Sequence, residues 1–185
     1  MALAFTKNIE LGYTAPSFAL PEPLSGKVRD LNELKGEFAT VVMFICNHCP
    51  YVKHVNQELV RLANDYIPKG ISFIAINSND AQKYPDDAPD KMTEVAKSLK
   101  YPFPYLFDES QDVAKAYYAV CTPDFSIFNS ELKCIYRGQL DDSRPGNNIK
   151  VTGQDIRAVL DAVLNNTQIP EKQTLSAGCS IKWKN

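Results

Sequence analysis

Two apolar runs of strand length, separated by one amphipathic segment, constrain the fold of this chain more than any other feature. The runs cover residues 41–45 and 71–76 and are continuous rather than alternating, as in strands covered on both faces. Between them, apolar residues recur every three or four positions over 52–66, which predicts a helix. A strand, a helix and a strand at this spacing predict two parallel strands joined by a crossover helix.

The remaining patterns extend this unit into an α/β fold with a central mixed sheet flanked by helices. A hairpin over 16–28, with its turn near Ser25-Gly26, is predicted as an N-terminal extension. A helix over 92–99, an antiparallel hairpin over 125–137 and a last helix after Thr152 follow, and Asp155 has the spacing of a capping box with Thr152.

The domain organisation is predicted to be simple. We expect a single domain over 1–169 and a tail over 170–185 that packs on it, because no linker or repeat divides the 185 residues. The tail has no helical or strand periodicity, and Ile181 and Trp183 are the apolar residues that would dock it. The turn-like stretch 84–89 is interpreted as a loop.

Charge excludes some classes of partner. With 20 Lys and Arg against 22 Asp and Glu, the formal net charge is −2, so no basic footprint for nucleic acid or an anionic membrane is present. No apolar stretch approaches the roughly 20 residues of a membrane helix. The first seven residues lack the pattern of a secretory signal, so a cytoplasmic location is expected.

The cysteines carry the chemical information. Their number is five, so disulfides within one chain cannot pair them all. Two stand three apart in Cys46-Asn47-His48-Cys49, and Pro50 is suited to the first position of the helix. Cys49 is then the N-cap residue, where the helix dipole and unpaired N–H groups stabilise a thiolate and cysteine pKa values fall to about 3.5–7.5. Cys49 is the predicted nucleophile.

Residues around Cys49 allow more than one interpretation. Cys46 leaves the end of the strand and can fold back to meet Cys49, and a protonated His48 adds positive charge beside the thiolate. The alternative is a Cu(I) or Zn site made by Cys46, His48, Cys49 and His54, which are soft ligands. A third possibility is an inert scaffold. Without a metal site, His54 is interpreted as an ordinary surface or half-buried histidine of the helix.

Three separated motifs resemble one known group. They are Cys-Asn-His-Cys-Pro-Tyr at 46–51, Cys-Thr-Pro-Asp-Phe at 121–125 and Gly-Cys-Ser-Ile-Lys-Trp at 178–183. With the segments 12–18 and 31–36, they resemble the thioredoxin superfamily, in its peroxiredoxin-like group (alkyl hydroperoxide reductase/thiol-specific antioxidant, redoxin). The resemblance covers about 12–164 and implies a thioredoxin-like fold.

The resemblance also implies roles for single residues. Thr122 and Pro123 match the cis-proline loop, which in this fold faces the nucleophile and offers backbone groups to a substrate disulfide. From the residues alone, Pro123 could equally be a trans proline that opens a strand. With this loop we place His48 and Pro50 at the substrate site. Cys121 would lie close enough to resolve a mixed disulfide, or would simply pack.

The chain departs from the resembled families at several positions. The second cysteine of dithiol thioredoxins is Val52 here, and the Thr and Pro that precede a peroxidatic cysteine are Cys46 and Val42. Arg144 could supply the cation that orients a peroxide, or be an ordinary exposed arginine. Cys179 could be a distant resolving thiol on the tail, or could pack or be free.

We therefore expect a thiol–disulfide oxidoreductase, with Cys49 as nucleophile and Cys46 as resolving partner, and no cofactor. Its partners would be a disulfide-containing protein, a small thiol or a peroxide, together with an external dithiol reductant of the thioredoxin or glutathione type. A thiol-dependent peroxidase is the nearest alternative, and the Cys/His metal-binding module is the second.

Overall fold

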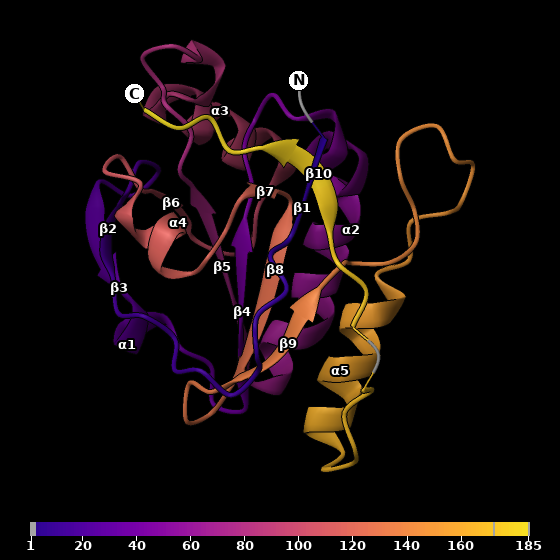
Figure 1. The fold of residues 1–185 in the computed structure, drawn as a ribbon. Coiled ribbons are helices and arrows are strands. Elements are labelled where there is room, and N and C mark those ends of the chain that lie inside the picture. Colours follow the sequence, from indigo (N-terminus) through magenta and orange to yellow (C-terminus); the bar gives the residue numbers. More distant parts are fainter. Residues whose placement is uncertain (1–2, 172, 185) are drawn as a thin grey trace.

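The structure is a computed structural model and describes residues 3–171 and 173–184. At its centre lies a five-stranded mixed sheet in the order β6-β5-β4-β8-β9 (Figure 1). The strands β4 (Ala39–Phe44), β5 (Ile71–Asn77) and β6 (Tyr105–Phe107) are parallel, while β8 (Asp124–Asn129) and β9 (Cys134–Gly138) continue the sheet in antiparallel pairing. The predicted central mixed sheet and its crossover are confirmed.

Residues of β4 alternate between two apolar layers, as the period of a strand requires. Val41 and Met43 pack against α2 (Pro50–Tyr66), α3 (Pro89–Leu99) and α5 (Gln154–Leu164). Val42 and Phe44 pack on the other face, against α1 (Leu31–Leu34) and α4 (Asp112–Ala116). The carboxyl end of β4 is thereby fixed beside the start of α2, which matters for the site.

The predicted N-terminal hairpin is present as β2 (Ala19–Glu22) and β3 (Lys27–Asp30), paired antiparallel. The predicted capping box of the last helix is wrong. The residue before α5 is Gly153, with φ 67°, and the backbone N–H groups of Thr152 and Gly153 both donate to Asp141 Oδ2 at 2.7 Å. The Asp141 carboxylate therefore holds the chain where the threonine was expected to cap it.

The expectation that the tail has no strand is also wrong. Within it, β10 (Ala177–Ser180) is the middle strand of a second, antiparallel sheet, between β1 (Leu3–Phe5) and β7 (Cys121–Thr122). Figure 1 shows β10, in yellow, at one end of the main sheet beside these two strands. Ile181 is buried as predicted, whereas Trp183 is 38% exposed.

Polar contacts hold the residues that follow β10. The carbonyl of Lys182 accepts from the backbone N–H of Asp80 at 2.8 Å and from Gln111 Nε2 at 2.8 Å, and its N–H donates to Asn79 Oδ1 at 2.8 Å. The tail is thus fixed on the loop after β5. The predicted ranges 1–169 and 170–185 include residues 1, 2, 172 and 185, which lie outside the described part of the chain.

Two short 3-10 turns complete the described elements, η1 (Ile67–Lys69) and η2 (Pro85–Asp87). The second of them occupies the stretch 84–89 that the sequence marks as a loop. Among the helices of residues 3–171 and 173–184, none combines the length and apolarity needed to cross a membrane.

Candidate active site

Cys49 is the N-cap residue of α2, as predicted. Its backbone is extended, with φ −65° and ψ 123°, and Pro50 occupies the first helical turn. Pro50 loses nothing there, because the first N–H groups of a helix have no partner within it. The Cys49 side chain is completely buried. The positive end of the helix dipole therefore lies beside a fully buried thiol.

The Cys49 sulfur has close contacts with Thr122 and with β10. The thiol donates to the carbonyl of Thr122 at 3.2 Å, and its Sγ lies 2.8 Å from Sγ of Cys179 in β10. Thr122 precedes Pro123, and the peptide bond between them is cis. The cis-proline loop is thus present beside the nucleophile, where the resemblance placed it.

The surroundings favour the thiolate form of Cys49. The hydrogen bond from the Cys46 thiol is the largest effect, and together with those from Cys179, the Val52 N–H and Thr122 it outweighs the cost of burial and lowers the pKa of Cys49 to about 5. The pKa values of the two neighbouring thiols, Cys46 and Cys179, are raised instead. The hydrogen bond to Cys49, followed by burial, raises the pKa of Cys46, while burial and then the contact with Cys49 raise that of Cys179 to about 12. One thiolate among three thiols is the expected ionisation state at pH 7.

Cys46 follows the end of β4 and is buried next to Cys49, as expected from the sequence. Its Sγ lies 3.4 Å from Oγ1 of Thr122. Thr122 thus contacts both cysteines of the motif, one through its carbonyl and one through its hydroxyl. The cis-proline loop and the two cysteines form one contiguous group.

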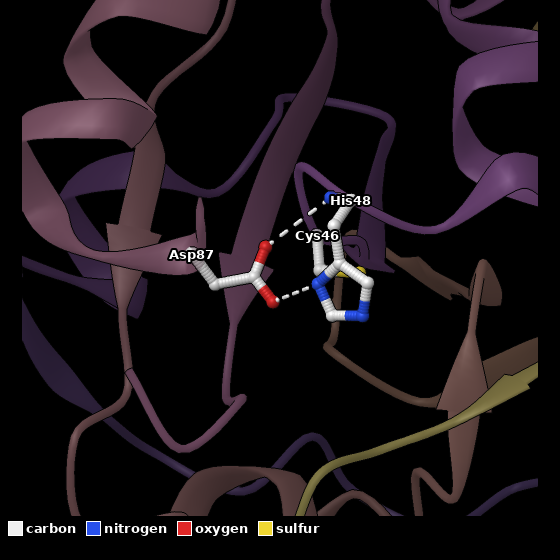
Figure 2. A group of neighbouring side chains, drawn as sticks. All are labelled: Cys46, His48 and Asp87. Atoms are coloured by element: carbon white, nitrogen blue, oxygen red, sulfur yellow. Dashed lines mark hydrogen bonds and ion pairs between the residues drawn. The ribbon is translucent and has the colours of Figure 1, made fainter. Parts of the chain in front are cut away.

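His48 belongs to a second polar group that the sequence did not predict, centred on Asp87. Figure 2 shows the Asp87 carboxylate facing the His48 ring and backbone. His48 Nδ1 donates to Asp87 Oδ2 at 2.6 Å, and the N–H of Asn47 donates to Oδ1 at 2.8 Å. The hydrogen bond to Asp87 raises the pKa of His48, although burial opposes this change. Burial disfavours the charged form of Asp87, but the bonds from His48 and Asn79 prevail and lower its pKa.

Asp87 has a sequence signal that could have revealed it. It lies in the turn-like stretch 84–89, which follows β5, and the carboxyl ends of parallel strands meet at one edge of a sheet. The loop after β5 therefore had to lie beside the motif that follows β4. Tyr84, from the same stretch, stacks on His48 with ring centroids 5.6 Å apart.

The other predicted residues lie outside this contact group. Cys121 contacts Thr6 Oγ1 at 3.9 Å and the carbonyl of Pro123 at 3.8 Å, since it points to the opposite side of β7 from Thr122. Arg144 donates to the carbonyls of Asp141 and Ser143 at 2.6 and 2.7 Å, in the loop between β9 and α5. Both side chains are thus engaged away from the Cys49 sulfur.

The predicted metal ligands are only partly brought together. Cys46, His48 and Asp87 place one potential ligand atom each within 4.8 Å of one another, whereas His54 bonds to Ser143 Oγ at 2.7 Å. The Asp87 oxygens already accept four hydrogen bonds, from Asn47, His48 (twice) and Asn79. A metal ion would have to displace part of this network, and the ligand set expected from the sequence is not assembled.

The fold and the site define a thioredoxin-fold redox protein. Proteins of this class share three features, all present here. They have a mixed sheet, a cysteine at the start of the helix that follows the central strand, and a cis-proline that faces this cysteine. The family comparison is specific: the Redoxin family model matches residues 10–156, and the chain belongs to this family, within the peroxiredoxin-like group of the thioredoxin superfamily. Oxidation–reduction through thiols is the chemistry of the family.

Solved structures agree with this assignment. An uncharacterized conserved protein from Geobacillus kaustophilus is 62% identical, with all of this chain and 97% of that chain covered and a TM-score of 0.98. A hypothetical protein from Sinorhizobium meliloti 1021 is 44% identical, with coverage of 97% and 98% and a TM-score of 0.95. A putative thiol:disulfide interchange protein DsbE from Chlorobium tepidum shares the fold at 18% identity, with coverage of 85% and 99% and a TM-score of 0.66. The curated proteins gave no match.

Proposed function

We propose that this redoxin is a thiol–disulfide oxidoreductase in which the Cys49 thiolate is the nucleophile. The observation that carries the proposal is the position of the buried Cys49 at the N-terminus of α2, beside the Thr122 carbonyl of the cis-proline loop and 2.8 Å from the Cys179 sulfur. A thiolate, and not a thiol, attacks a disulfide. The Thr122–Pro123 loop, with the adjoining His48 and Pro50, is the proposed wall of the substrate site.

The proposed reaction moves two electrons from the protein to an oxidant. Cys49 attacks one sulfur of a disulfide, a thiolate leaves, and a second thiol of the chain then attacks Cys49 to release the other half. The sequence predicts Cys46 for the second role, with Cys121 and Cys179 as alternatives. An external dithiol of the thioredoxin or glutathione type would reduce the enzyme again, in a reducing compartment such as the cytoplasm, which suits five unpaired cysteines.

A thiol-dependent peroxidase is the second candidate, and the burial of Cys49 favours it, because only a small oxidant reaches a sulfur with no exposed surface. Two features speak against full peroxiredoxin chemistry. The position of the conserved threonine is Cys46, and the guanidinium of Arg144 is engaged by backbone carbonyls of its own loop. Metal binding at Cys46 and His48 would be detected as stoichiometric Cu or Zn in protein purified under reducing conditions.

The function is tested by giving the reduced protein either a small disulfide or a hydroperoxide, with an external dithiol as reductant. We expect both oxidants to be consumed catalytically, with the higher kcat/KM for the disulfide, because the site lacks the peroxide-orienting residues. Loss of two thiols per chain in a single turnover, counted by alkylation and mass spectrometry, would support the dithiol cycle. No thiol oxidation by either oxidant would contradict the proposed function.

A further inference from the structure

The fold brings Cys179 within reach of a disulfide bond with Cys49, from 130 residues away in the sequence. The two Sγ atoms are 2.8 Å apart, and a disulfide needs about 2.05 Å, so a displacement below about 1 Å suffices. Cys179 is 4% exposed and Cys49 is not exposed at all. The pair is therefore an enclosed dithiol and not a chance encounter of two surface groups.

The backbone holds Cys179 in this position from both sides. Cys179 pairs with Leu3 of β1 on one edge of β10 and with Thr122 of β7 on the other. Immediately outside the strand, Ser176 Oγ donates to the carbonyl of Pro123 at 2.7 Å, and the Ile181 N–H donates to that of Val120 at 3.0 Å. A thiol fixed by paired backbone on two edges loses little entropy when it forms a bond.

Backbone N–H groups at the start of α2 affect the pKa values of both Cys49 and Cys179. The Val52 N–H lowers the pKa of Cys49, and the Tyr51 N–H acts in the same direction on the pKa of Cys179. Burial, followed by the contact with Cys49, raises the pKa of Cys179, but the Lys182 ammonium and the Tyr51 N–H act against that rise. For Cys46 the Asp87 carboxylate adds to the rise in pKa that the Cys49 bond and burial cause. The Lys182 ammonium thus favours the thiolate of Cys179, whereas the Asp87 carboxylate disfavours the thiolate of Cys46.

We propose that Cys179 is the resolving thiol and that the Cys49–Cys179 disulfide is the oxidised form of the enzyme. This inference rests on the proposed function, because it needs Cys49 as the nucleophile. Cys46 then acts as the hydrogen-bond donor that stabilises the Cys49 thiolate. The strand that carries Cys179 also covers Cys49, so the first oxidant is a small molecule, a hydroperoxide or a low-molecular-weight disulfide.

The electron balance is the same for both oxidants. With a hydroperoxide, the Cys49 thiolate attacks the distal oxygen, the O–O bond breaks, an alcohol or water leaves after protonation, and Cys49 becomes a sulfenic acid. With a small disulfide, Cys49 forms a mixed disulfide and one thiolate leaves. The Cys179 thiolate then attacks the Cys49 sulfur, and hydroxide or the second thiolate leaves and takes a proton. Two electrons have passed to the oxidant, and an external dithiol returns them.

Tryptic mapping tests the pairing directly. Cys46 and Cys49 share the tryptic peptide 36–53, while Cys179 lies in 173–182. Reduced protein is given one equivalent of hydrogen peroxide or of 2-hydroxyethyl disulfide, quenched in acid, alkylated and digested. We expect 36–53 to be joined to 173–182, both in the wild type and in Cys46→Ser. The matched control, Cys134→Ser, changes another buried cysteine, on β9, and should give the same joined peptides.

Cys179→Ser should lose the joined peptides and accumulate a Cys49 sulfenic acid that dimedone traps, and its turnover should fall by at least about tenfold. A disulfide within 36–53 in the wild type would overturn the proposal and assign resolution to Cys46, with the proposed function intact. Turnover of Cys179→Ser within about twofold of the wild type would also overturn it. If Cys49 is oxidised in none of the proteins, the proposed function itself fails.

Discussion

Replacement of Cys49 by serine is expected to lower the turnover of a small disulfide or a hydroperoxide by at least about a thousandfold. A serine hydroxyl stays protonated near pH 7, so the N–H and thiol donors that stabilise the Cys49 thiolate have no anion to act on. The measurement is oxidant consumption by purified protein with excess dithiol reductant. Activity above about one tenth of the wild type would show that the nucleophile lies elsewhere.

Cys134→Ser is the matched control for this variant. Cys134 is also buried, but its thiol contacts the carbonyl of Tyr136 at 3.4 Å, on the side of the sheet that packs against α1 and α4. The substitution therefore measures the cost of replacing a buried thiol without touching the site. Turnover close to that of the wild type, with an unchanged circular dichroism spectrum, is the expected result.

Gly178→Ala is expected to separate Cys179 from Cys49. A Cβ atom at Gly178 would lie 2.0 Å from the carbonyl oxygen of Thr122 and 3.1 Å from Pro123 Cδ, so β10 has to move away from β7. The rate of Cys49–Cys179 disulfide formation after oxidation should fall by at least about tenfold, because that step depends on the placement of the two sulfurs. The crowding should also cost about 1–3 kcal/mol of unfolding free energy, measured by denaturant titration.

Gly146→Ala provides the comparison. Its φ is 84°, which a side chain disfavours, but no atom lies within 4 Å of the added Cβ. The variant should lose up to about 1 kcal/mol of stability and keep the normal rate of disulfide formation. Equal rates in Gly178→Ala and the wild type would contradict the view that β10 positions Cys179.

The sequence predicts the parts of the fold whose residues carry their own pattern. The apolar runs that became β4 and β5, the stripe of α2 and the cap position of Cys49 were all readable, because burial and capping act locally. The strands β1, β7 and β10 have two to four residues each and form only through pairing across the whole chain. Strand propensity depends strongly on the neighbouring strands, so the sequence Ala-Gly-Cys-Ser of β10 does not by itself predict a strand.

The candidate site shows the same division. Cys46, His48 and Cys49 follow from one motif, and the Thr122–Pro123 loop followed from resemblance. Predicting Asp87 as a site residue would have needed one further inference, namely that the loops after neighbouring parallel strands lie at the same edge of the sheet. The contact between Cys49 and Cys179 could not be derived, since it depends on the register that sets Cys179 opposite Thr122. A shift of that register by one residue would turn the thiol to the other face.

The rate of alkylation of Cys49 as a function of pH tests the central claim, that the fold holds this thiol as a thiolate. Because a thiolate reacts and a thiol does not, a lowered pKa keeps the reactive form present at pH 7 and removes it only as the pH falls through the folded-state value. Iodoacetamide labelling of Cys49, localised by fragmentation of the peptide 36–53, should reach its plateau by about pH 7, and in denaturant the inflection should return to about 8.5. A rate in the folded protein that still rises through pH 8, as for an ordinary cysteine, would contradict the account.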